Sequence, residues 1–230
     1  MRNYRIKLFL LYLLHIAGGI WYALDPFQSP MRALAVPLTI SIGIWLAYEY
    51  WHGYAVPLLT DTQPPRLRRR NFLLWCLIVV TGSMAIETFA VQTGMIFGQY
   101  RYGTILSPFV GPIPFSTGFK WLGIILCSIA IVTRSTPRSL RLNPFAGALM
   151  TALFTMIFDI VMEPAAVTLG YKSWVGNTIP LHDYVAWFII SFVFAFIGFL
   201  LRLFEGKSPL VALHAYFAQA GYLLLVTIGK

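Results

Sequence analysis

Charged side chains are scarce in this chain of 230 residues, and their scarcity decides the class of protein. Asp, Glu, Lys and Arg make up 11% of the sequence, whereas a soluble globular domain carries about 25%. With 58% hydrophobic residues and a mean hydropathy of +0.73, the composition excludes an ordinary soluble domain and predicts a polytopic membrane protein. No charged tail or low-complexity linker interrupts it, so we expect a single transmembrane helical domain over residues 1–230.

Residues that usually hold metals and cofactors are also few. Cys76 and Cys127 both fall within apolar runs, which argues against a disulfide and leaves no metal-ligand spacing. The four histidines are scattered, without the HxxxH or HxxHH spacing of a membrane di-iron centre. The sequence also lacks a DDxxD element, a GxGxxG turn, a P-loop and a GxSxG elbow. What remains is an acid–base site, which we expect to need no metal and no cofactor.

Long apolar runs are what the chain has in place of charge. Roughly seven segments approach the ~20 residues that span the hydrocarbon of a bilayer. We therefore predict an all-α fold in which about seven transmembrane helices form one bundle. The connection 93–117 is rich in Gly, Pro and aromatic residues, and we expect part of it to re-enter the membrane. The segments are 6–24, 32–51, 71–92, 118–134, 143–168, 184–203 and 208–228.

Basic residues predict the orientation. Seven crossings put the N-terminus and the loops 52–70, 135–142 and 204–207 on one side of the membrane. That side, with its flanks, holds 12 of the 17 Lys and Arg residues, so we assign it to the cytoplasm. Clustering at the ends of apolar segments, as in RLRRR, argues against nucleic acid as a partner. We expect a protein of the cytoplasmic (inner) membrane whose N-terminus is cytoplasmic and whose first helix is not cleaved.

The acidic residues gather toward the other side. Glu87 and Asp159 each lie 16 residues beyond a predicted cytoplasmic helix start, or ~24 Å deep at ~1.5 Å per residue. Glu163 stands four residues after Asp159 in FDIVMEPAAV, on the same helix face and ~30 Å from the inner surface of the membrane. Asp25 and Asp183 flank segments on the outer side. Five of the eight acidic residues thus converge on the outer third of the membrane, where ionisable groups mark functional sites.

Two aromatic loops follow the helices that carry these acids. One reads FGQYRYG and then PFVGPIPF before Trp121; the other reads GYKSW and then IPLHDYVAW, which ends at Trp187. In both loops, Tyr is followed by a basic residue and then by an aromatic residue, and a Pro stands seven residues before the Trp. We interpret this as a weak internal repeat of helix, aromatic loop, proline and helix.

The aromatic residues directly after the acidic helices differ from an ordinary interfacial belt. Their rings are placed to pack a flat apolar ligand and to stabilise a cation. For Arg101 and Lys172, a hydrogen bond to a carboxylate and contact with lipid headgroups are equally open. His182, beside Asp183, is a further candidate at the rim. The candidate aromatic residues are Tyr100, Tyr102, Tyr171, Trp174 and Trp187.

The order of these features resembles the carotenoid biosynthesis family of CruF-type, bisanhydrobacterioruberin hydratase-like carotenoid hydratases. The matching elements are FGQYRYG, the IPF before Trp121, FDIVMEPAAVTLGYKSW and IPLHDYVAW, close to half of the chain. This chain departs from the family's usual Asp-Pro at Glu163-Pro164, from its Trp at Tyr171, and from its Asn and Gly at Asp183 and Ala186. The resemblance implies a reaction class and does not select a substrate.

That reaction is addition of water to the terminal double bond of an acyclic (ψ) carotenoid end group, such as that of lycopene or of a monocyclic or C50 relative. The alkene would be protonated and water would capture the tertiary cation, which makes the protein a hydro-lyase without a cofactor. Our hypothesis makes Asp159 the general acid, with Glu163 and Glu87 as water-activating or proton-sharing partners. Spacing alone leaves their individual roles open. Water would come from the interface and the polyene from the bilayer.

Two other functions fit part of the pattern. A membrane lycopene-type cyclase would use the same first protonation, but its Pro-x-Glu signature is absent. A proton-coupled transporter or a carotenoid-binding protein would need no chemistry at the acids. Transporter acids tend to sit at the midplane between inverted repeats, whereas these lie off-centre in a repeat of parallel orientation.

Overall fold

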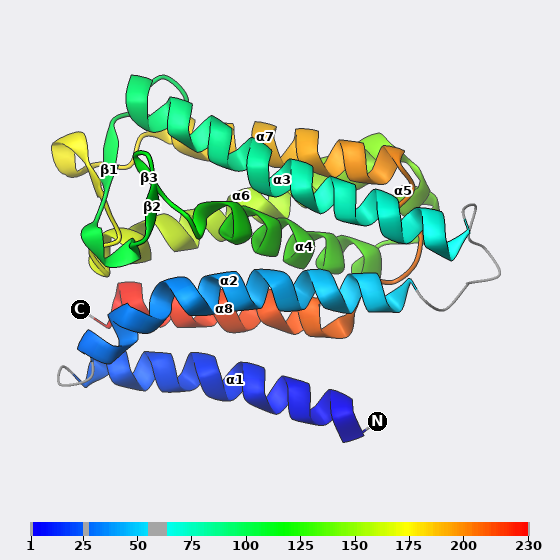
Figure 1. Cartoon of the computed structure of the whole chain (residues 1–230), viewed down its shortest axis with the longest axis horizontal. Coiled ribbons are helices and arrows are strands. Elements are labelled where there is room, and N and C mark those ends of the chain that lie inside the picture. The colour runs from blue at the N-terminus through cyan, green and yellow to red at the C-terminus, as the bar shows by residue number, and fades with distance from the viewer. Residues whose placement is uncertain (1, 25–27, 55–63, 230) are drawn as a thin grey trace.

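The structure is a computed structural model that describes residues 2–24, 28–54 and 64–229, where long helices lie side by side (Figure 1). Seven of the described helices are long and apolar enough to cross a bilayer. This confirms the predicted all-α, polytopic membrane fold. Those helices are α1 (Arg2–Ala23), α2 (Gln28–Gly53), α3 (Pro65–Thr93), α4 (Thr117–Ser135), α6 (Pro144–Thr168), α7 (Leu181–Leu200) and α8 (Leu210–Ile228).

Helix boundaries differ from the predicted ones, most clearly at α3. The sequence predicts a loop over 52–70, which is wrong for 65–70, because α3 begins at Pro65 and includes the RLRRR run. A proline at the first helical position lacks an N–H that would be unpaired there in any case, so it favours a helix start. Within the predicted loop 135–142, the short helix α5 (Arg138–Leu142) precedes α6.

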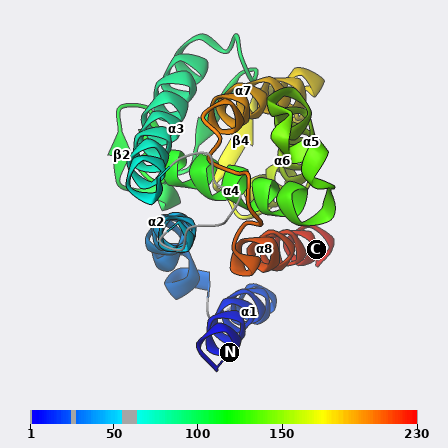
Figure 2. The same ribbon diagram turned by 90° about the vertical axis from the view of Figure 1, so that its right-hand side faces the viewer.

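Helix α4 lies at the centre of the packing. Every residue from Trp121 to Thr133 is buried, and the end view places α4 between α2, α3, α6 and α8 (Figure 2). Small residues allow such close contacts between membrane helices. A Cβ atom on Gly43 of α2, for example, would lie 2.8 Å from the carbonyl oxygen of Phe119. Helix α1 lies farthest out and packs mainly on α8 (Figures 1 and 2).

Short strands and 3-10 helices form a cap at one end of the bundle. Strand β1 pairs antiparallel with β4, which joins two connections that lie about seventy residues apart in the sequence. Figure 1 shows β1, β2 and β3 at the same end, where β4 pairs with β1, and the N-terminus of α1 lies at the opposite end. The elements of the cap are β1 (Tyr100–Tyr102), η2 (Thr104–Leu106), β2 (Phe109–Val110), β3 (Ile113–Pro114), β4 (Lys172–Trp174) and η3 (Val175–Asn177).

Gly103 allows the two parts of the cap to approach, and its replacement is expected to destabilise the protein. Its amide donates a hydrogen bond to the carbonyl of Tyr171 (2.9 Å), and a Cβ there would lie 2.1 Å from the carbonyl oxygen of Gly170. We expect Gly103→Ala to cost about 1–3 kcal/mol of stability through this overlap. The midpoint of thermal unfolding of the detergent-purified protein measures it.

Gly221→Ala is the matched control. It lies in α8 with no atom within 4 Å of the added Cβ, so it should keep or raise the midpoint through better helix propensity. Equal midpoints for Gly103→Ala and the parent protein would refute the role of Gly103.

Candidate active site

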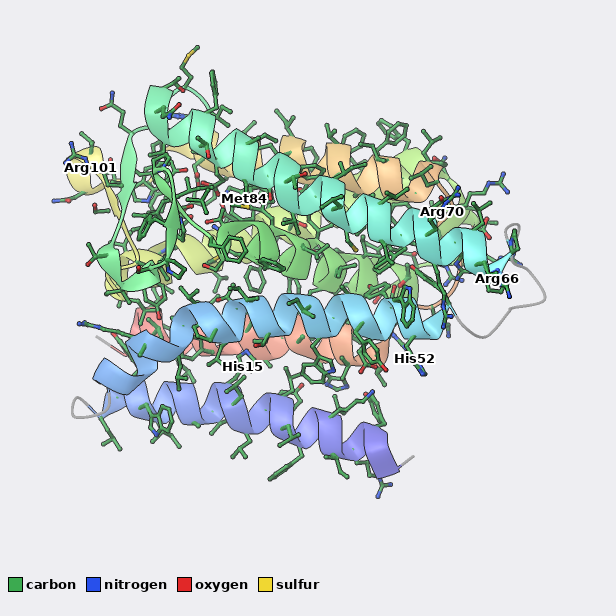
Figure 3. All side chains as sticks on the ribbon, viewed as in Figure 1. His15, His52, Arg66, Arg70, Met84 and Arg101 are labelled. Carbon is green, nitrogen blue, oxygen red and sulfur yellow. The ribbon has the colours of Figure 1, made fainter. Side chains whose placement is uncertain are left out.

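The paired strands β1 and β4 sort their side chains by alternation. Directly opposite pairs are Tyr100 with Trp174 and Tyr102 with Lys172. Since successive side chains of a strand point to opposite faces, these four face the helices together, while Arg101 between the tyrosines is exposed. Figure 3 shows Arg101 at the outer end of the cap. Of the two alternatives for Arg101, the direction of its side chain therefore favours the membrane surface over a carboxylate.

Glu87 of α3 is surrounded by hydrogen-bond donors. Its carboxylate accepts from the hydroxyls of Tyr100 (2.5 Å) and Tyr102 (2.8 Å) and from Nε1 of Trp121 (3.0 Å). The ammonium of Lys120 lies 3.7 Å away. Only 2% of Glu87 is exposed, and three donors with a nearby cation stabilise the ionised carboxylate.

Burial and Glu87 act on the two tyrosines in the same direction. Burial raises the pKa of Tyr100, and the negative charge of Glu87 raises it further, because a second negative charge beside a carboxylate is unfavourable. The same two causes raise the pKa of Tyr102 well above its ordinary value. Both hydroxyls therefore keep their protons and donate them in hydrogen bonds to Glu87.

Lys172 connects the cap to Glu163 of α6. Its ammonium lies 2.9 Å from Oε1 of Glu163, and Trp174 donates its Nε1 hydrogen to Oε2 (3.2 Å). The Lys172 ammonium also lies 3.9 Å from the centroid of the Tyr100 ring and 4.1 Å from that of the Trp174 ring. Burial lowers the pKa of Lys172, but the negative charges of Glu163, Asp183 and Glu87 offset this and leave the pKa above its ordinary value. Lys172 is therefore charged although buried.

Asp159 of α6 and Asp183 in the first turn of α7 form the third part of the site. Both are completely buried, and apart from each other no residue in the described ranges donates a hydrogen bond to any of their four carboxyl oxygens. One oxygen from each, with one from Glu163, lies within 4.8 Å of the other two. Asp159 and Glu163 thus lie together on one helix face as predicted, and Asp183, which was also predicted to converge on them, lies beside them.

The same three carboxylates could hold a metal ion. Hard divalent cations such as Mg²⁺ and Ca²⁺ prefer oxygen ligands of this kind. Glu163, however, is already bound to the ammonium of Lys172, which would repel a second cation. A proton on Asp159 or Asp183 satisfies the pair without further ligands. The absence of a metal stays a prediction.

An apolar cavity of about 240 Å³ reaches this site from the side of α1, α2 and α8. Its body is lined by residues such as Leu38, Ile42 and Phe158. Its polar end contains Glu163 and Lys172. The other polar lining residues at that end are Tyr102, Ser116, Thr117, Lys120 and Tyr171. The lining therefore suits the tip of an apolar molecule whose reactive group lies at the polar end.

The structure divides the aromatic candidates into two groups. Tyr102 and Tyr171 line the cavity. Tyr100 and Trp174 instead place their ring faces against the ammonium of Lys172. Neither ring is part of the cavity lining, so their direct contact with a ligand stays a prediction. The ammonium of Lys172 lies against the ring faces, where we predicted a cation of the ligand.

The remaining candidates lie around the site. Trp187 stacks on Trp121 with ring centroids 3.8 Å apart, which joins the two aromatic loops that resemble each other in sequence. His182 is exposed at the start of α7. Of the carboxylates, Glu163 lines the cavity, whereas Glu87 and Asp159 lie behind its wall. Asp25, predicted to join them, lies outside the described residues.

Three residues that complete the site were not among the candidates. Lys120 and Trp121 contact Glu87, and Thr117 lines the cavity. All three lie in the first two turns of α4. The sequence does contain a signal for them, because Thr117 precedes Trp121 by four residues as Asp183 precedes Trp187.

Comparison with known proteins points to one family. The family model described as "Carotenoid biosynthesis protein" matches residues 33–228, which leaves α1 outside the matched segment. Bisanhydrobacterioruberin hydratase of Haloarcula japonica is 27% identical over 145 residues, 58% of this chain and 46% of that protein. The chain thus spans about half the length of this relative. No solved structure matches.

The donors around Glu87 predict a large stability difference between substitutions at this position. Glu87→Leu leaves three buried donors and Lys120 without their acceptor and should cost about 3–5 kcal/mol. Glu87→Gln keeps one carbonyl acceptor and should cost less. Thermal unfolding in detergent measures both.

Glu49→Gln serves as the control, because the Lys7–Glu49 pair is partly exposed. Such a pair contributes at most about 1 kcal/mol. A midpoint for Glu87→Leu no lower than that of Glu49→Gln would contradict the structural role assigned to Glu87.

Proposed function

Because the chain belongs to the carotenoid biosynthesis protein family, we propose that it is a carotenoid hydratase, which adds water to the terminal double bond of an acyclic end group. The observation that carries the proposal is a buried carboxyl pair without donors, Asp159 and Asp183, beside Glu163 at the polar end of an apolar cavity. The relative's name supports the same reaction class.

The charges around the site support a proton on the aspartates. Glu163 is paired with Lys172, and Glu87 lies beside Lys120, so two carboxylates are matched by two ammonium groups. Asp159 and Asp183 form no ion pair with a described residue, and the ammonium of Lys172 acts on them only at longer range. Two buried negative charges in contact without donors are strongly unfavourable, so the pair holds at least one proton. This proton is the one available for the alkene.

The proposed reaction uses the carboxyls in sequence. Asp159 supplies the proton, and Glu163, which lies between it and the cavity, hands it to the CH carbon of the terminal double bond. The tertiary carbon becomes a cation. The oxygen of a water molecule forms the C–O bond, and its surplus proton goes to the carboxylate of Glu163 and back to Asp159. The product is a tertiary alcohol, and the enzyme regains its first protonation state.

Glu87 acts in this scheme through Tyr102. The ring of Tyr102 lines the cavity and its hydroxyl donates to Glu87. A phenol that donates to a carboxylate carries more negative charge on its ring, which favours a neighbouring cation. Glu87 would therefore be a positioning residue, and Tyr102 would take the place expected of Tyr100 and Trp174 as the aromatic face toward the carbocation.

The proposed orientation places the cap at the outer face of the cytoplasmic membrane. Arg66 and Arg70 lie at the end of the bundle opposite Arg101 (Figure 3), and the positive-inside rule assigns their end to the cytoplasm. The cap would then supply water from the outer interface. The polyene would enter from the bilayer between the helices that line the cavity.

Substitution of the acids tests the assignment. Asp159→Asn and Glu163→Gln should each lower hydration by about 10²-fold or more, because general acid–base catalysis contributes that much. Asp183→Asn should lower it less, because Asp159 can still carry the proton. The measurement is carotenoid turnover in membranes that contain equal amounts of inserted protein. Undiminished turnover by Asp159→Asn would refute the scheme.

Product analysis separates hydration from the other functions. Expression in a lycopene-producing bacterium should yield carotenoids heavier by one or two molecules of water, as read by chromatography and mass spectrometry. A cyclase would give products of unchanged mass. Unaltered pigment together with proton or solute flux in vesicles would favour a transporter.

A further inference from the structure

One buried hydroxyl in the cavity has no role in the scheme so far. Thr117 is the first residue of α4 and is 2% exposed. Its Oγ1 interacts with the hydroxyl of Tyr102 but has no partner in full hydrogen-bond geometry in the part of the chain that the structure describes. It lines the same polar end of the cavity as Glu163. A buried hydroxyl without a partner is unfavourable, so a ligand that hydrogen-bonds to it is expected there.

The surroundings of Thr117 suit a water molecule. Ser116, the N-cap of α4, makes no side-chain capping bond, so the first backbone N–H groups of this 19-residue helix are not satisfied by it. Helix N-termini favour oxygen ligands with negative charge or a lone pair. Water with two or more polar neighbours is well held in a buried site of this kind.

We infer that Thr117 and Glu163 together hold the water molecule that attacks the cation, an assignment that rests on the proposed hydration. One hydrogen of the water is donated to the carboxylate of Glu163 and the other to Oγ1 of Thr117. A lone pair then points into the cavity and forms the C–O bond to the tertiary carbon. The proton released from oxygen passes to Glu163, so no further reagent is needed. Thr117 is a positioning residue and exchanges no proton with the substrate.

Tyr102 shows that the two groups lie on one side of the cavity. Burial raises the pKa of Tyr102 first, the negative charges of Glu87 and Glu163 raise it further, and a hydrogen bond with the hydroxyl of Thr117 lowers it. Tyr102 is thus near both Glu163 and Thr117. Its neighbour across the strands is Lys172, which binds Glu163. This arrangement brings the two proposed water ligands within one polar pocket.

The internal repeat supports the same position independently. Thr117 lies four residues before Trp121, and Asp183 lies four residues before Trp187. The two tryptophan rings stack, and Thr117 and Asp183 each lie in the first turn of their helix, α4 and α7. At the start of α7, Asp183 lies beside the proposed proton donor Asp159. At the start of α4, Thr117 instead places a neutral hydroxyl at the cavity. The neutral group is the one suited to hold a nucleophile without taking its proton.

The experiment separates protonation from water capture. Membranes with the full-length protein are supplied with lycopene in D₂O, and both the hydrated product and the deuterium content of recovered carotenoid are measured. In Thr117→Val the cation still forms but captures water poorly, and it returns to alkene by losing a proton. We expect hydration to fall by about tenfold or more while deuterium continues to enter the recovered carotenoid. Thr117→Ser keeps the hydroxyl and should restore hydration.

Controls make each result decisive. Thr151→Val also removes a buried threonine hydroxyl, one that donates to Gly147 within α6, and should change neither measurement. Asp159→Asn should lose hydration and deuterium entry together, and failure of that result would overturn the proposed function itself. Wild-type hydration by Thr117→Val would overturn the water site. Equal loss of hydration and deuterium entry in Thr117→Val would do so as well.

Discussion

A lysine ammonium buried beside a glutamate is the interaction on which the rest of the site depends. Lys172 lies 2.9 Å from Glu163 and is only 6% exposed. Such a charge is tolerated in a low-dielectric interior only when it is paired and hydrogen-bonded. The pairing of β1 with β4, the position of the Tyr100 and Trp174 rings, and the closure of the cap over the helices all serve to hold this ammonium in place.

The two halves of the molecule use related parts with different charge. Glu87 and Glu163 each lie near the end of a long helix and accept a hydrogen bond from a tryptophan Nε1. Four residues before them stand Ser83 and Asp159, and both are fully buried. The group around Glu87 thus contains one carboxylate and one ammonium, whereas the group around Glu163 and Lys172 contains two additional acids, Asp159 and Asp183. In the proposed reaction, this asymmetry separates proton storage from the stabilisation of positive charge.

Much of the fold can be predicted from the apolar segments, and the depth of each acid in the membrane can be predicted from its position along its segment. Glu87, Asp159 and Glu163 were expected near one depth. Asp159 and Glu163 meet on one face of α6, whereas Glu87 of α3 lies among its own donors beside Lys120. Tyr100 and Trp174 show where this reasoning stops. Their distance from the acids along the chain is short in both cases, but strand pairing places both rings on Lys172 and away from the cavity.

The sequence by itself determined the membrane class, the number of spanning helices and the enclosure of several acids in apolar surroundings, because hydrophobic length and helical rise are local properties of the chain. Tertiary structure decided the charge partner of each acid. Lys120 of α4 reaches Glu87 across a helix–helix contact, and Lys172 is held beside Glu163 by the pairing of β4 with the distant strand β1. Thr117 reaches the cavity through the packing of α4. Local periodicity says nothing about which side chains meet across helices, and in the proposed reaction those meetings set which carboxyl is ionised and which carries the proton.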